Sequence, residues 1–161
     1  LYDVKGTTKK EIGKLFDVKG TTKNQIAKVW DVKGTVKTLI YQAQSDTYTV
    51  TASATKDNTT VTSSKITNTD ATYKKMVIES VSVSGGNNGQ NWAKLYCNGV
   101  CVKDTGTKTS PSLFRTAVKS WSGSFDISQK GTVYVQVWTD KDENIDDSQD
   151  TTSVTIKFHF E

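Results

Sequence analysis

The apolar and polar positions of the chain follow two different patterns. Residues 1–42 contain three tandem 14-residue units, LYDVKGTTKKEIGK, LFDVKGTTKNQIAK and VWDVKGTVKTLIYQ. In each unit an aromatic residue precedes Asp-Val-Lys-Gly, and an isoleucine lies near the end. Repeats of fixed period indicate small units that cannot bury an apolar face alone and depend on neighbours. We therefore expect an assembly or docking array at 1–42, a connector at 43–46 and a separate domain at 47–161.

The second region has the pattern of an all-β domain. Short stretches rich in β-branched and aromatic residues are separated by clusters of Asn, Asp, Gly and Lys. Short strands at such regular spacing are typical of an Ig-like antiparallel β-sandwich. We expect strands at residues 48–54, 60–66, 75–83, 92–97, 100–104, 113–121, 132–139 and 153–160.

Two of these strands predict which face is buried. In the last strand, Val154, Ile156, Phe158 and Phe160 alternate with polar residues that include His159, which we expect on the exposed face. In strand 132–139, three valines occupy one face, and the other face carries Tyr134 and Trp138. The aromatic pair would either pack beneath a loop or support a contact surface.

The repeats permit two interpretations. Thr8 with Glu11, and Thr22 with Gln25, have the spacing of helix capping boxes, and residues 7–31 could form a DNA-binding helix-turn-helix. The third unit lacks this capping pair and is rich in β-branched residues. The glycines at 6, 13, 20 and 34 also leave at most 13 residues between them, which is marginal for a helix in water. A turn glycine after an apolar stretch favours an array of short β-hairpins.

The repeats also resemble those of a known class of proteins. The core Asp-Val-Lys-Gly-Thr and the closing stretch VKGTVKTLIY at 32–41 are similar to repeats in tail-tip, fibre and other minor structural proteins of phages that infect Gram-positive bacteria. In many of those repeats a Trp precedes the Lys, where this chain has Thr. The resemblance covers 1–42 by motif and the remainder only by architecture.

This resemblance implies a non-enzymatic component of a virion, such as a tail, fibre or decoration protein, that displays the sandwich outward. Its partners would be other virion proteins and further copies of itself, and its location would be the virion or the extracellular space. The expected assembly interface consists of the repeated apolar residues Tyr2, Val4, Ile12, Phe16, Val18, Ile26, Trp30, Val32 and Ile40.

Charge is distributed unevenly between the two regions. Residues 1–43 contain nine lysines and four acidic residues, a net charge of +5, whereas the whole chain carries +4. A basic arm could contact nucleic acid, lipid or an acidic protein. Lysines at fixed repeat positions also keep exposed strand edges soluble, and we favour this interpretation, with no nucleic-acid partner. No apolar run is long enough to span a membrane, so we expect no membrane contact.

The two cysteines, Cys97 and Cys101, flank Asn98-Gly99. Asn-Gly between apolar stretches is a strong hairpin signal. A two-residue turn would pair Cys97 with Val100 and place the thiols on opposite faces, whereas a three-residue loop would allow a disulfide. We favour buried free thiols.

Candidate chemistry is sparse, and we do not expect an enzyme or a cofactor. No catalytic or nucleotide-binding motif is present, and the chain has one histidine. Oxygen ligands at alternating positions suggest a possible calcium loop, although Ile145 stands where an EF-hand requires glycine. An acidic exposed loop is the simpler interpretation. The possible ligands are Asp140, Asp142, Asn144 and Asp146.

A polar loop that ends in a tryptophan gives the alternative function, an extracellular adhesin module that binds a cell-surface glycan. Such loops can bind sugars by hydrogen bonding and ring stacking, but they are also ordinary turn sequences. The candidate residues are Asn87, Asn88, Gln90, Asn91 and Trp92.

Overall fold

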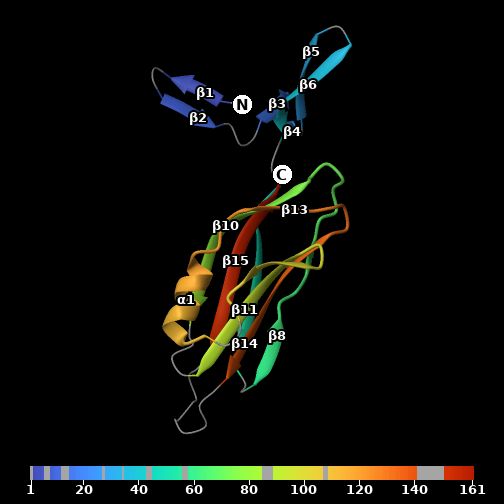
Figure 1. Ribbon diagram of the computed structural model, residues 1–161. Helices are drawn as coiled ribbons and strands as arrows, with labels where there is room; N and C mark the ends of the chain where they lie inside the picture. The colour runs from blue at the N-terminus through green and yellow to red at the C-terminus, as the bar shows by residue number, and fades with distance from the viewer. Residues whose placement is uncertain are drawn as a thin grey trace. The chain divides into compact units, whose positions relative to one another are not determined.

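The computed structural model describes residues 2–5, 8–11, 15–26, 28–33, 35–42, 45–55, 58–84, 89–106, 109–140 and 151–161. The chain divides into two compact units, Leu1–Ser45 together with Glu161, and Asp46–Phe160 (Figure 1). The expected boundary at 43–46 lies at this division.

The first unit contains three antiparallel hairpins, one for each sequence repeat. They are β1 (Tyr2–Lys5) with β2 (Thr8–Glu11), β3 (Leu15–Lys19) with β4 (Thr22–Ile26), and β5 (Lys28–Lys33) with β6 (Val36–Gln42). The register repeats as well, because the lysine of each Asp-Val-Lys pairs with the residue three positions later. Each pair of strands is therefore joined by two residues, and the prediction of short β-hairpins is confirmed.

The turn of the second hairpin shows why glycine is needed in the repeat. Gly20 has φ +64°, and Thr21, which follows it, has a negative φ. A positive φ at the first central residue of a two-residue loop is the property of a type II′ turn, which glycine adopts without strain. Thr8, Glu11, Thr22 and Gln25, the residues of the two predicted capping boxes, lie in strands β2 and β4. The helix-turn-helix interpretation is therefore wrong.

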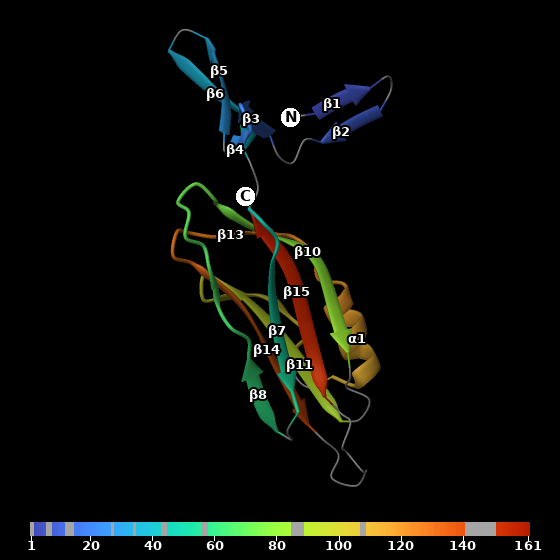
Figure 2. The ribbon, with the colours of Figure 1, turned by 180° about the vertical axis from the view of Figure 1, so that it is seen from behind.

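The second unit is a sandwich of two antiparallel sheets (Figures 1 and 2). The first sheet has the order β13 (Ser124–Asp126), β10 (Lys75–Ser84), β15 (Thr152–Phe160) and β7 (Tyr48–Ala54). The second sheet has the order β12 (Val100–Asp104), β11 (Gln90–Cys97), β14 (Thr132–Asp140) and β8 (Thr59–Thr62), and β9 (Ile66–Thr67) also pairs with β14. The all-β sandwich is confirmed, and the predicted strand 60–66 is divided into β8 and β9.

Within the confirmed class of all-β sandwiches, the strand order differs from the expected Ig-like one, whose sheets are ABED and CFG. If β8 and β9 are counted as one broken strand, the sandwich strands in chain order form sheets 1-8-3-6 and 2-7-4-5. Only the β11–β12 hairpin stays within one sheet, and every other connection crosses between sheets. This connectivity is that of a jelly roll, in which two Greek keys wrap eight strands into two sheets.

The core lies between the sheets and follows the predicted alternation. Val154, Ile156 and Phe158 of β15 are fully buried, as are all three valines on the inner face of β14. Tyr134 lies on the opposite, outer face of β14, as predicted. The prediction for His159 is wrong, because only 9% of this residue is exposed.

The predicted strand at 113–121 is also wrong, because this segment forms helix α1 (Pro111–Lys119). Proline at the first helical turn is favourable, since its fixed φ suits a helix and its missing N–H costs no hydrogen bond there. Phe114 and Val118 are one turn apart and fully buried. The helix contacts β10 and β11 and closes one side of the core (Figures 1 and 2). No helix among the described residues has the length and apolarity needed to cross a membrane.

The cysteine hairpin has the predicted two-residue turn. Cys97 pairs with Val100, and both Asn98 and Gly99 have positive φ, +54° and +76°, as a type I′ turn requires. Both cysteines are free, but only Cys97 is buried, whereas Cys101 is exposed. Burial, with a further contribution from Asp126, raises the pKa of the Cys97 thiol from 9.0 to about 11.

We predict that the two thiols react in different states of the protein. At pH 8, Ellman's reagent should modify Cys101 in the native protein and Cys97 only after unfolding in guanidinium, because the reagent needs an accessible thiolate. The Cys101→Ser variant should then show no reaction in the native state. Two reactive thiols in the native wild-type protein would contradict this assignment.

The raised pKa of Cys97 also predicts a direction for stability at alkaline pH. Between pH 9 and about 11 the unfolded chain loses the Cys97 proton while the folded chain retains it. Since the folded state then binds more protons, the free energy of unfolding should fall as pH rises through this range. Urea titrations of the wild type and Cys97→Ala measure the effect, and an equal slope in both would contradict it.

Candidate ligand-binding surface

The predicted glycan-binding residues do not form one surface. Asn87 and Asn88 lie outside the described residues, Gln90 begins β11 and is exposed, and Asn91 is fully buried. Trp92 points to the opposite side of β11 and lies on the outer face of the second sheet. The alternation of one strand therefore separates Asn91 from its two neighbours.

Asn91 belongs to a buried polar group at one end of the sandwich. Its Oδ1 accepts a hydrogen bond from Thr152 Oγ1 at 2.8 Å, and its backbone pairs with Thr109 in both directions. Thr139 Oγ1 lies 3.5 Å from Thr152 Oγ1. These contacts link β11, β14 and β15, so Asn91 has a structural place in the fold.

The outer face of the second sheet carries cross-strand aromatic pairs. Trp92 is opposite Trp138 with ring centroids 6.4 Å apart, and Tyr96 is opposite Tyr134 with centroids 4.8 Å apart. Between these rows, Lys94 is opposite Gln136. We call this surface the aromatic face and define it by six residues: Trp92, Lys94, Tyr96, Tyr134, Gln136 and Trp138.

Lysines lie against both aromatic pairs. Lys94 Nζ is 5.3 Å from the Trp92 ring centroid and 3.4 Å from Asp104 Oδ2, and Lys65 Nζ is 5.0 Å from the Tyr134 ring centroid. These distances suit cation–π attraction, which is worth about 0.5–1 kcal/mol at exposed sites. Partial burial raises the pKa of Tyr96, so its phenol keeps its proton and can donate a hydrogen bond.

Exposure differs across the aromatic face. Trp138 is buried, with 6% of its surface exposed, whereas Trp92, Tyr96 and Tyr134 are half-buried. The face therefore offers a ligand three partly open aromatic rings together with the amide of Gln136 and the ammonium of Lys94. Sequence reasoning identified Trp92 as a candidate, but not the register that places Tyr96 and Tyr134 beside it.

A second polar cluster lies on the outer side of the first sheet. His159 Nδ1 is 2.9 Å from Glu79 Oε1, and Thr47 Oγ1 donates to both Glu79 carboxylate oxygens at 3.0 Å. The hydroxyl therefore bonds the carboxylate and not the imidazole, so this arrangement does not activate Thr47 as a nucleophile. The contacts join the start of the sandwich to its last strand.

The predicted assembly residues are exposed or half-buried where the structure describes their side chains. Phe16, Val18, Trp30 and Val32 have exposed fractions of 49%, 57%, 47% and 55%, and Ile26 is half-buried. Tyr2 and Val4 lie in β1 and Ile40 in β6, while Ile12 lies outside the described residues. The aromatic residue and the valine thus recur as an exposed pair in the second and third hairpins.

The possible calcium ligands lie mostly beyond what the structure describes. Asp140 ends β14, whereas Asp142, Asn144 and Asp146 lie outside the described residues. Among the described residues, no group of three or more His, Cys, Asp or Glu side chains is placed to hold a metal ion.

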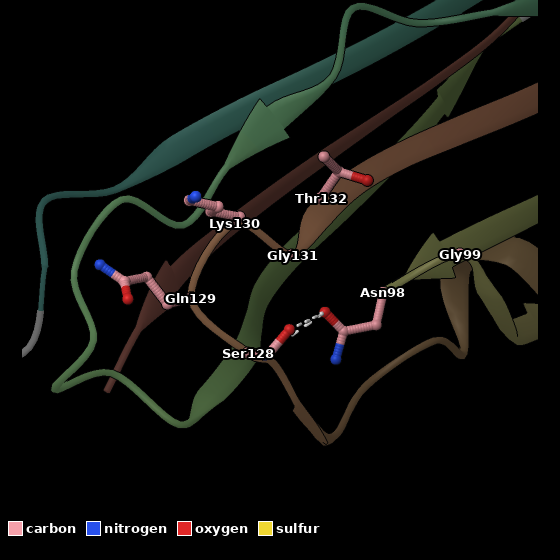
Figure 3. A pocket seen from close by; sticks show the side chains of 7 residues that line it. All are labelled: Asn98, Gly99, Ser128, Gln129, Lys130, Gly131 and Thr132. Atoms are coloured by element: carbon pink, nitrogen blue, oxygen red, sulfur yellow. Dashed lines mark hydrogen bonds between the residues drawn. The ribbon is translucent and has the colours of Figure 1, made fainter.

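A hollow of about 510 Å³ lies at the Asn98 end of the sandwich (Figure 3). Asn98 Oδ1 accepts hydrogen bonds from Ser128 N and Ser128 Oγ at 3.3 and 3.2 Å, and Nδ2 donates to Asp126 O at 3.2 Å. The Asn98 side chain is thus held by the turn opposite, and its polar atoms are already paired. The residues that line the hollow therefore hold two turns together, and we call this contact the Asn98 junction.

Gly131 makes this junction possible, and its replacement should be costly. A Cβ at this position would overlap Asn98 Oδ1 and approach Ile127 Cγ1 and Ser128 O to 2.9 Å each. We predict that Gly131→Ala lowers the free energy of unfolding by about 2 kcal/mol.

The matched control for this variant is Gly106→Ala. Gly106 has open space around it but φ +84°, so its replacement should cost only the backbone strain, about 1 kcal/mol. Urea unfolding midpoints at constant m-value measure both variants. An equal loss for the two variants would show that the Asn98 junction does not constrain Gly131.

The comparisons with known proteins assign no function to the chain, so a proposal must be based on the surfaces described above. No protein-family model matches the chain, and neither a curated protein nor a solved structure shows significant similarity to it.

Proposed function

We propose that this chain is a non-enzymatic structural protein of a phage virion, a tail, fibre or decoration component in which the hairpin array mediates assembly and the sandwich is displayed. The observation that carries the proposal is the repeated exposure of an aromatic residue and a valine, Phe16 with Val18 and Trp30 with Val32. Surfaces rich in exposed aromatic residues are typical of contact sites between proteins.

The physics of an isolated hairpin supports the same proposal. A two-stranded hairpin is marginally stable in water, and a third strand or a packed surface is needed for independent stability. Both strands of such a hairpin also have one unpaired edge, which can pair with another chain. An array of three hairpins, of which the second and third expose apolar residues, is therefore suited to stabilisation by further copies or by other virion proteins.

The architecture of the second unit is compatible with this role. Jelly rolls occur in viral capsid proteins and in lectins, although a fold alone does not assign a function. The resemblance of the repeats to those of minor phage structural proteins favours the virion.

We predict that replacement of the exposed aromatic residues of the array disrupts assembly. The double variant Phe16→Ser with Trp30→Ser should lower the oligomer mass in size-exclusion chromatography with light scattering, because it removes apolar area that a partner buries. The melting temperature of the sandwich should change little.

A matched control replaces two exposed apolar residues of the sandwich, Val100 and Leu113, each 63% exposed, with serine. This control should keep the wild-type mass. A wild-type chain that stays monomeric, or an equal effect of both double variants, would contradict the assembly role of the array.

The virion assignment has its own test. Mass spectrometry of purified particles of the phage that encodes the chain should detect the polypeptide, and electron microscopy with an antibody to the sandwich should locate it on the outside. Particles that lack the polypeptide would exclude the proposal.

A further inference from the structure

The aromatic face has a composition that the packing of the sandwich does not require. The outer face of an antiparallel sheet that meets solvent usually alternates polar residues with the buried set. Here the two central strands of the second sheet place four large aromatic residues there. Cross-strand pairing stabilises a sheet by about 0.2–1 kcal/mol per pair, and aliphatic β-branched or threonine pairs provide this too. The aromatic residues therefore point to a contact.

We propose that the aromatic face binds a glycan chain that lies along β11 and β14 and contacts Trp92, Tyr96 and Tyr134. This inference does not depend on the assembly role of the array.

The chemistry of the face favours a sugar over other partners. Its rows contain aromatic rings, the Gln136 amide and the Lys94 ammonium. They also contain the hydroxyls of Thr60 and Thr62 on β8 and the exposed thiol of Cys101 opposite Tyr96, and the described residues of these rows include no aliphatic side chain. A sugar has C–H groups that pack on aromatic carbon and hydroxyls that need donors and acceptors. Tyrosine and tryptophan combine an apolar body with a polar atom and can satisfy both needs.

A protein or a nucleic acid fits this face less well. Protein interfaces also use aromatic residues, but they surround them with aliphatic side chains in a buried apolar centre, and the described residues of this face include none. Single-stranded nucleic acid requires a strongly basic groove, but the face and its border have Lys65 and Lys94 against Asp104 and Asp140, a net charge of zero. An uncharged, hydroxyl-rich chain needs no such charge.

The spacing of the rows predicts the size of the ligand. Trp92 and Tyr96 are four residues apart on one strand, which corresponds to about 13 Å at the rise of an antiparallel strand. A ligand that contacts both rows must therefore be an oligosaccharide and not a single sugar.

Lys94 must move before a sugar can stack on the Trp92 ring. Its ammonium lies over the Trp92 ring and is paired with Asp104, and 33% of its side chain is exposed. An exposed ion pair of this kind contributes at most about 1 kcal/mol. A sugar can therefore displace the ammonium from the ring at low cost, and the freed Lys94 and Asp104 become hydrogen-bonding partners for its hydroxyls.

The test uses the full chain on an array of bacterial and eukaryotic oligosaccharides of three or more units, followed by calorimetry with the strongest ligand. We expect binding in the full chain and at least a tenfold loss of per-protomer affinity in Trp92→Ala. Leu113→Ala, which removes an exposed apolar side chain of helix α1 outside the aromatic face, should keep the wild-type affinity per protomer. Silence on the array, or equal losses in the two variants, would overturn the proposal.

Two conservative variants separate ligand contact from sheet stability. Trp92→Phe keeps an aromatic ring opposite Trp138, and Tyr96→Phe keeps the stack on Tyr134, so both should retain the wild-type unfolding midpoint. Each should still weaken binding several-fold, because the indole surface or the phenol hydroxyl is lost. Unchanged affinity in both would overturn the proposal, as would tighter binding of a dT20 oligonucleotide with steep salt dependence.

Discussion

The alternation of side chains along β11 and β14 is the constraint on which the sandwich and its outer surface both depend. Ala93, Leu95 and Cys97 face Val137, Val135 and Val133 across this central pair, and all six are buried. Because successive residues of a strand point to opposite faces, burial of this set places Trp92, Lys94 and Tyr96 outside. A register shift of one residue would bury the lysine and expose the leucine. The core thus determines the geometry of the aromatic face.

Much of this fold could be predicted from the sequence because its strongest signals are local. The period-two pattern of residues 153–160, the Asn98-Gly99 turn and the turn glycine Gly20 all act over a few residues, and each predicted the observed backbone. Helix α1 was missed because Phe114, Thr116 and Val118, which are aromatic or β-branched and occupy alternate positions, suit a strand as well. The signals for a helix were Pro111 and the one-turn spacing of Phe114 and Val118. The order of the strands within each sheet depends on long-range pairing, which no local pattern encodes.

The candidate surface was predicted only in part for the same reason. Trp92 follows a polar loop and was identified from that context, but its partners come from strand β14, about 40 residues away in the sequence. Asn91 illustrates the opposite error, since a polar residue beside a loop was assigned to the surface although Thr152 provides it with a buried hydrogen bond. Placing either residue requires the register of β11 against β14, which is set by the whole core.

The two units differ in how they can be stable, and this difference bears on how the protein works. The sandwich buries a continuous core between two sheets, whereas the second and third hairpins leave their aromatic residue and valine about half exposed. A partner that binds only the folded hairpin lowers the free energy of that state and so increases its population. Under the proposed assembly role, folding of the array and its assembly would therefore be thermodynamically linked, while the sandwich has its own core. Such a division lets one end of the chain respond to its partners and keeps the aromatic face unchanged.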